Sequence, residues 1–339
     1  MIFGFIIAIR LTIGCKKEDD TQNYDNDRII YITESIKVDN SITIHDPNLN
    51  LVAYEKFLKY LISSNRFLIV PQKDFDKTFS DDKVVLSLRH DVDDDINASI
   101  KMAYIEHKYG IVSTYFILHT AKYYGITKAN YFKRNDKIIY YLEKLQNSFG
   151  HEIGIHNDLV TLQVIYHIEP KSFLSNQLKW LRDNGINVYG TSAHGSNYCY
   201  LFHYSNTYFW KSSPYEGSSF TNFEFIQTNT SFFPVQLTFE DADTWNKNNS
   251  IDKVKIENQG MPNPVENVNK HPANNIKIIK DDKENYGLVY DANFLKDNYY
   301  FSDATIYPGG KRWHMGVQNF NEIPIGQKVI ILIHPQHWN

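Results

Sequence analysis

Short apolar segments alternate with amphipathic segments from Lys83 to about residue 190. The apolar segments are rich in β-branched and aromatic residues, as buried strands are, while the amphipathic ones carry apolar residues at helical spacing. This alternation predicts an α/β fold with a parallel sheet or a barrel rather than a sandwich. In chain order we expect strands at 84–88, 111–118, 151–156 and 187–190, helices at 97–110, 136–147 and 170–184, and a closing strand that begins at Lys328.

The sequence outside this region predicts further parts of the chain. YEKFLKYLISS (54–64) places apolar residues on one helical face, which indicates a helix before the barrel. The stretch near 241–285 is rich in proline and asparagine and predicts a loop insertion. The expected organisation is a signal at 1–15, a polar tether at 16–30, an N-terminal helical extension at 31–82, and the barrel at 83–339.

The N-terminus resembles a bacterial lipoprotein signal. Its apolar stretch is too short to span a bilayer permanently but has the length of a secretion-signal core. LTIGC ends at Cys15, the expected lipidation site, and KKEDD after it resembles the tag of surface lipoproteins in Bacteroides-like bacteria. Arg10 and Thr12 depart from the pattern, so a wrong start codon or an ordinary buried strand is the alternative. Lipidation predicts anchoring to the cell envelope, at the outer membrane or surface of a Gram-negative bacterium, without a membrane span; a misread signal predicts a cytoplasmic protein.

Composition narrows the class of protein. A hydrophobic content of 42% is that of a globular chain, and a net charge of -4 without a basic stripe argues against a nucleic-acid partner. No protein partner is predicted. Cys15 and Cys199 lie far apart, which indicates no disulfide framework. The 24 tyrosines and 21 phenylalanines fit sugar-stacking surfaces, although general compositional bias explains them more simply.

Crowded carboxylates follow the first barrel strand, in LSLRHDVDDD (86–95). Residues i and i+2 of a strand share a face, so Asp91 and Asp93 point one way and His90 the other. Two such carboxylates need a cation beside them, because otherwise the pKa of one would have to rise strongly. The pattern therefore favours an acid–base group combined with a metal ligand.

Two other interpretations apply to the same run. A calcium loop needs a glycine where Ile96 stands, so D-x-D-x-D is excluded as such a loop. Asp94 and Asp95 precede the helix at 97–110 and are assigned to its N-terminus. That role leaves Asp91 and Asp93 unexplained.

A second polar cluster, GHEIGIHND (150–158), ends another expected strand. His156 closes the strand, and Asp158 can share its face. Imidazole and carboxylate are the usual ligands of zinc and similar divalent metals. At the end of a second parallel strand, like Asp93, His156 becomes a candidate metal ligand.

The order RHDVD, GHEIG-x-H and a terminal LIHP-x-x-W resembles the polysaccharide deacetylase family (the NodB-homology carbohydrate esterases), in the branch that accompanies bacterial polysaccharide synthesis. The resemblance covers roughly residues 83–338 and implies a distorted (β/α) barrel with its site at the carboxyl ends of the strands. It implies Asp91 as the base, Asp93 and His156 as ligands of a divalent metal, zinc in the first place, and His334 as the acid.

The segment SDATIYPGGKRW (302–313) resembles the family's late aspartate–tryptophan segment. The resemblance implies that Asp303 orients a catalytic partner and that Trp313 lines the sugar site, with Arg312 as a further supporting residue.

The chain departs from the family at the second metal histidine. That residue normally lies four positions after the first, where this chain has Val160. Asp158 or His194 is expected to supply the third ligand, and the sequence does not choose between them. YGTSAHGS, which contains His194, replaces the family's arginine-containing motif, so His194 is also a candidate substrate-binding residue.

Three functions fit the sequence. The first is a metal-dependent deacetylase that hydrolyses acetyl groups, N-acetyl in preference to O-acetyl, on a bacterial polysaccharide or related glycan. The second is a catalytically degenerate glycan-binding lipoprotein of the same fold, which the incomplete histidine pair favours. The third is a barrel hydrolase acting on another C–N bond, because fold and metal do not fix the substrate.

Overall fold

The computed structural model describes residues 50–128, 130–196, 199, 205–213, 280–303 and 320–338. The predicted signal with Cys15, the tether, most of the insertion near 241–285, Arg312 and Trp313 lie outside these residues. The helices are α1 (Leu51–Ser63), α2 (Gln72–Phe75), α3 (Ile96–Lys108), α4 (Ile138–Glu143), α5 (Leu159–Val164) and α6 (Pro170–Asp183). The strands are β1 (Phe67–Ile69), β2 (Val84–Val92), β3 (Thr114–Leu118), β4 (Gly125–Lys128), β5 (Tyr131–Arg134), β6 (Glu152–Asn157), β7 (Val188–Ala193), β8 (Tyr290–Asp291), β9 (Tyr299–Ser302) and β10 (Lys328–Ile333).

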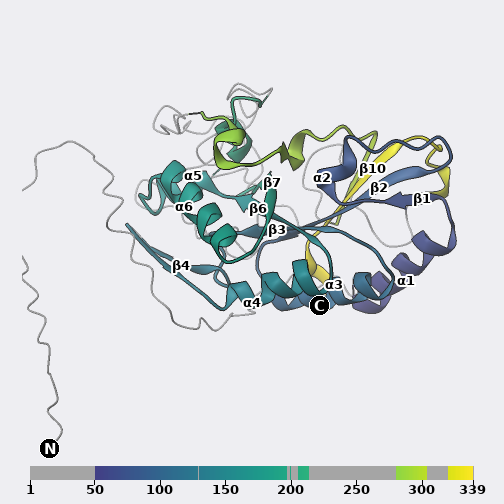
Figure 1. Ribbon diagram of the computed structural model, residues 1–339, viewed down its shortest axis with the longest axis horizontal. Coiled ribbons are helices and arrows are strands. Elements are labelled where there is room, and N and C mark those ends of the chain that lie inside the picture. The colour runs from purple at the N-terminus through teal and green to yellow at the C-terminus, as the bar shows by residue number, and fades with distance from the viewer. Residues whose placement is uncertain are drawn as a thin grey trace, which may run out of the picture.

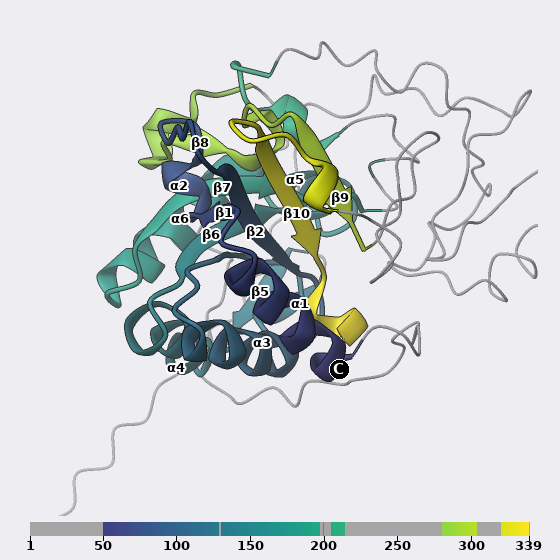
Figure 2. The same cartoon turned by 90° about the vertical axis from the view of Figure 1, so that its right-hand side faces the viewer.

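A curled, all-parallel sheet forms the centre of the molecule (Figures 1 and 2). Its strands follow the order β8-β7-β6-β3-β2-β10-β9, with β1 beside the first part of β2. Within the described residues the end strands β8 and β9 do not pair with each other, so the sheet curls through half a barrel. This α/β arrangement is compatible with the predicted (β/α) barrel.

Alternate residues of β2 face two different environments. Val84, Leu86 and Leu88 pack outwards with α1 and α3, while Val85 packs on the inner face of the half-barrel sheet. Every residue of β2 is buried, as expected for a parallel strand covered on both faces. Arg89 lies on the same inner face of β2, nearer the carboxyl end of the strand. The inner face is therefore apolar near the amino ends of the strands and charged near their carboxyl ends.

Most of the predicted elements are confirmed, with several differences. β2 extends to Val92 rather than ending at residue 88, so the RHDV segment is itself strand. The helix predicted at 136–147 is α4 followed by a π-helical turn, Lys144–Ser148. The hairpin of β4 and β5 and the short strands β1, β8 and β9 were not predicted. Since β1 pairs with β2, the boundary placed at residue 83 cuts through the sheet.

A buried carboxylate joins the N-terminal helix to the barrel. Glu106 of α3 accepts hydrogen bonds from Tyr54 of α1, from Tyr115 (2.6 Å) and from the His90 ring (2.7 Å), and all four side chains are fully buried. His90 thus faces away from Asp91, as predicted, and supports β2 from behind. Among the helices of the described ranges, none combines the length and apolar character needed to cross a bilayer.

Glu106→Gln is expected to destabilise the protein by about 1.5–3 kcal/mol at pH 7, because an amide cannot accept from all three donors. Burial would raise the pKa of Glu106, but His90 and its other partners outweigh it and lower the pKa from 4.5 to about 2. The stabilisation is therefore complete above about pH 4.5 and shrinks as the pH falls towards 2, where the folded carboxylate is protonated. Urea unfolding at pH 7 and pH 4 measures both effects, with exposed Glu143→Gln as the control. Equal stability of wild type and Glu106→Gln at pH 7 would contradict this role.

Candidate metal centre

The carboxyl ends of the parallel strands meet at one rim, and the strands deliver polar side chains there. The strand ends of β2, β6, β7, β9 and β10 bring the predicted site residues to this rim. The residues are Asp91, Asp93, His156, His194, Asp303 and His334.

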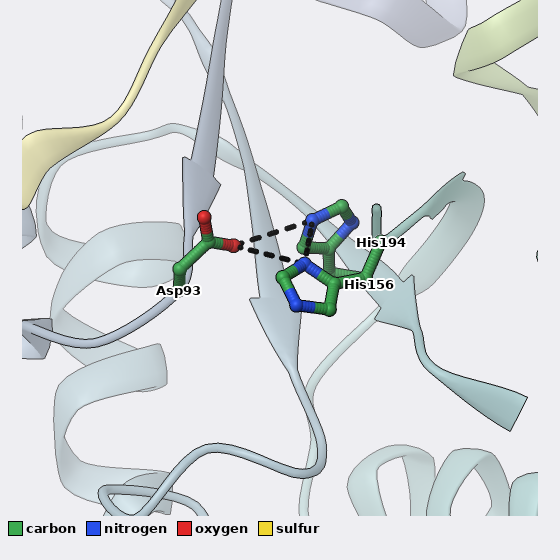
Figure 3. A group of neighbouring side chains, drawn as sticks. All are labelled: Asp93, His156 and His194. Atoms are coloured by element: carbon green, nitrogen blue, oxygen red, sulfur yellow. Dashed lines mark hydrogen bonds and ion pairs between the residues drawn. The ribbon is translucent and has the colours of Figure 1, made fainter. Parts of the chain in front are cut away.

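Asp93, His156 and His194 form a compact triangle (Figure 3). Asp93 Oδ1 lies 3.3 Å from His156 Nε2 and 3.5 Å from His194 Nδ1, and the two ring nitrogens are 3.2 Å apart. Burial would raise the pKa of Asp93, but the imidazoles, His194 first among them, hold it well below its usual range. The carboxylate is therefore ionised and aims one oxygen between two ring nitrogens.

This triangle fits a divalent metal. Ligand atoms at about 2.0–2.1 Å from a tetrahedral zinc ion are separated by about 3.3 Å, close to the observed spacings. Asp93 Oδ1 is buried, and among the described residues it makes only the two ion-pair contacts to the imidazoles and no hydrogen bond, so a cation would satisfy it. His156 Nδ1 lies 3.1 Å from the Ser192 carbonyl oxygen, which places the ring proton on Nδ1 and leaves Nε2 free to bind a metal.

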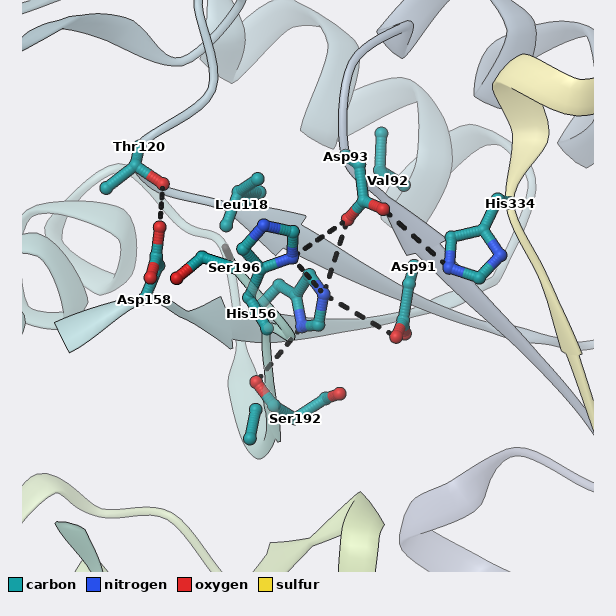
Figure 4. A network of polar contacts seen from close by, with 12 residues as sticks. Asp91, Val92, Asp93, Leu118, Thr120, His156, Asp158, Ser192, Ser196 and His334 are labelled. Carbon is teal, nitrogen blue, oxygen red and sulfur yellow. Dashed lines mark hydrogen bonds and ion pairs between the residues drawn. The ribbon is translucent and has the colours of Figure 1, made fainter. Parts of the chain in front are cut away.

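The geometry selects His194, and not Asp158, as the third member of the group. Figure 4 shows the Asp158 carboxylate turned to Thr120 and away from Asp93. Its oxygens accept hydrogen bonds from Thr120 (3.0 Å), Thr161 (2.7 Å) and Asn206 (3.2 Å). Asp158 lies on the turn between β6 and α5, where the chain leaves the strand, so the face alternation of β6 no longer fixes its direction.

Asp91 lies beside the triangle and is held by a guanidinium. Arg89 donates to both of its oxygens, at 2.9 and 2.7 Å, and also to the Ser192 hydroxyl. Asp91 Oδ2 is 3.5 Å from His156 Nε2. Burial would raise the pKa of Asp91, but Arg89 and then His156 outweigh it and lower the pKa, so the carboxylate is ionised.

His334 flanks the triangle from β10 (Figure 4). Its Nε2 is 3.7 Å from Asp93 Oδ2, and its Nδ1 hydrogen-bonds Asp303 at 2.6 Å. Asp303 is fully buried and also accepts from the His334 backbone N–H and from Trp338. Burial would lower the pKa of His334, but Asp303 outweighs it and raises the pKa to about 9. Asp303 therefore orients His334 and keeps it protonated.

A second acidic–imidazole group consists of Asp303, His334 and His337. Asp303 Oδ2 already accepts from the His334 N–H at 2.8 Å and from Trp338 at 2.9 Å, with His337 Nδ1 at 3.4 Å. These donors satisfy the carboxylate without a cation, so we interpret the group as a hydrogen-bonded support of His334.

Sequence reasoning missed several residues of the site. Arg89 is two positions before Asp91, so the strand alternation that paired Asp91 with Asp93 could have placed it on the same face. His337 lies beside Asp303, although no motif in the sequence indicates a role for it. His119, fully buried at the end of β3, accepts the Asp158 backbone N–H at 2.9 Å, and no sequence signal indicated this bond.

No protein-family model, no curated protein and no solved structure matches this chain.

Proposed function

We propose that this protein is a metal-dependent deacetylase that hydrolyses acetyl groups, N-acetyl in preference to O-acetyl, on a bacterial polysaccharide or related glycan. The observation that carries the proposal is the placement of a carboxylate and a protonated imidazole next to a candidate metal-binding triangle. Asp91 lies on β2 and His334 directly follows the neighbouring strand β10, and both face the same group of ligand atoms. The motif order of the deacetylase family supports the same assignment and a barrel of that type.

Asp91 is the proposed base. It is ionised and adjacent to His156, so it can take a proton from a water that attacks an acetamide carbonyl beside the triangle. Arg89 fixes the carboxylate through two bonds, which orients its remaining lone pairs towards the site. A bound divalent cation would polarise the acetyl carbonyl and make that water more acidic.

His334 is the proposed acid. Its Nδ1 is engaged by Asp303, which leaves Nε2 to face the site with a proton to give. Cleavage of an amide needs such a donor, because an amine leaves only when protonated. Its raised pKa, about 9, keeps the proton on the ring at neutral pH.

The proposal extends to metal, substrate and location. One carboxylate and two imidazoles are a donor set that suits zinc. The partner is a glycan and not a nucleic acid, in keeping with the net charge of -4. Lipidation at Cys15 would hold the protein at the cell envelope, where such a polymer is met.

The purified protein is expected to contain about one equivalent of zinc and to release acetate from acetylated glycans. Chelation should remove the metal and the activity together, and zinc should restore both, because Asp93 Oδ1 and the two imidazoles are the proposed ligands. Elemental analysis and an acetate assay over N- and O-acetylated glycans make the measurement. If the protein binds metal and glycan but releases no acetate, the glycan-binding alternative is supported. If it releases ammonia or another amine product without acetate, cleavage of another C–N bond is supported.

A further inference from the structure

A buried asparagine, Asn206, links the segment after β7 that contains His194 to neighbouring parts of the site. Asn206 begins the 3₁₀ turn Asn206–Phe209 and is fully buried. Its side-chain Nδ2 donates to the His194 carbonyl oxygen at 2.7 Å and to Asp158 Oδ1 at 3.2 Å, and it contacts Cys199 Sγ at 3.2 Å. Its Oδ1 accepts the Val160 backbone N–H at 2.9 Å. One amide therefore joins the loop after β7 to the first turn of α5.

The backbone of His194 is held from both sides. Its N–H donates to the Asn157 carbonyl oxygen at 2.9 Å, which continues the pairing of β7 with β6. Its carbonyl oxygen accepts from Asn206. His194 lies one residue beyond the end of β7, so these two bonds take over from the sheet in fixing the backbone from which its ring projects.

Asp158 anchors this arrangement from the other side. Its carboxylate accepts from Thr120 after β3 and from Thr161 in α5, as well as from Asn206. His119 fixes the Asp158 backbone by accepting its N–H. The side chain of Asp158 is thus immobilised by its neighbours and presents one oxygen to Asn206.

Val160 connects Asn206 to the segment that follows His156. Val160 lies four residues after His156, and its side chain is fully buried among apolar residues, so α5 contributes no imidazole from that position. Asn206 binds the Val160 N–H and the His194 carbonyl with opposite ends of one amide. The position of the segment that contains His194 is therefore fixed relative to α5, the helix that follows His156.

We propose that Asn206, anchored by Asp158, is a positioning residue for His194 and so for the third metal ligand, which this chain takes from the end of β7. The inference rests on the metal site in the proposed function. Removal of a partner that orients a metal ligand costs about 10–100-fold in metal affinity. Asn206→Ala should weaken zinc binding by a factor in that range, through His194 alone.

The test is a double-mutant cycle on zinc affinity, measured by competition with a chromophoric chelator on the metal-free full chain. The variants are wild type, Asn206→Ala, His194→Ala and the double variant. We expect Asn206→Ala to weaken binding about 10–100-fold in the wild-type background and not at all in the His194→Ala background. An equal loss in both backgrounds would mean a general structural role, and no loss in either would mean no role; both overturn the inference.

Asn135→Ala is the matched control. Asn135 is also buried and bonds backbone groups on both ends of its amide, donating to Tyr123 O and accepting from Lys137 N, away from the triangle. It should lower the melting temperature without changing zinc affinity. If Asn206→Ala does not fold, Asp158→Asn tests the same link with an isosteric change, and a loss of affinity that persists without His194 overturns the inference. A wild type that binds no zinc overturns the proposed function itself, whereas a zinc-binding wild type with an unaffected Asn206→Ala overturns only the positioning role.

Discussion

Asp93→Ala is expected to abolish stoichiometric metal binding and, with it, acetate release. Asp93 supplies the anionic member of the triangle, and its Oδ1 lies 3.3 and 3.5 Å from the two ring nitrogens. Without it, two imidazoles that repel each other when protonated are left to hold a cation. The loss of affinity should exceed the roughly 100-fold typical for a residue that only supports a ligand.

Elemental analysis of the purified variant and zinc competition measure the effect. Asp94→Ala is the matched control, because it removes the neighbouring carboxylate while the triangle of Asp93, His156 and His194 stays complete. The metal site would be refuted if Asp93→Ala retained wild-type zinc affinity. Equal losses in both variants would point to the general charge of the segment rather than to coordination.

Asp91→Asn is expected to retain the metal and to lower kcat by about 10²–10⁴-fold, the usual contribution of a general base. The amide keeps the size of the side chain but cannot take a proton from water. Asp91 lies outside the triangle, so zinc affinity should stay close to that of the wild type.

The Asp91→Asn substitution also disturbs the ion pair with Arg89, which donates to both oxygens of the wild-type Asp91 carboxylate. The melting temperature and the metal content are therefore measured beside kcat, so that loss of chemistry is separated from loss of structure. A folded, metal-loaded Asp91→Asn with activity within about tenfold of wild type would remove Asp91 from the role of base.

Strand alternation and helix capping, which relate residues close in sequence, predicted the side-chain directions correctly where the contacts lie within or next to one element. The alternation of β2 placed Asp91 towards the site and His90 towards the core, as the Glu106 contact confirms, and Asp93, one residue beyond the strand, also faces the site. Asp95 was assigned to the N-terminus of the following helix, and its carboxylate accepts the N–H groups of Asn97 and Ala98 at 2.8 and 3.1 Å. In each case a fixed backbone geometry relates residues that are near in sequence.

Local rules failed where two distant elements meet. His156 and His194 are 38 residues apart, yet their ring nitrogens lie within 3.2 Å of each other. That proximity depends on the pairing of β6 with β7, whose register shifts between Ile153 and Gly154. The supporting Asn206 belongs to yet another segment, and its amide reaches the site only because the chain returns there.

The sequence by itself determined the alternation of strands and helices, the rim at which polar residues gather, and the side of β2 on which the carboxylates lie. These properties follow from the side-chain periodicity of each helix or strand and from hydrophobic burial, and both can be recognised from residues that are close in sequence. Only the tertiary structure decided that His194 and not Asp158 completes the triangle. Strand order, register and the direction of a side chain beyond a strand end are set by contacts between segments far apart in the chain, and no local pattern encodes them.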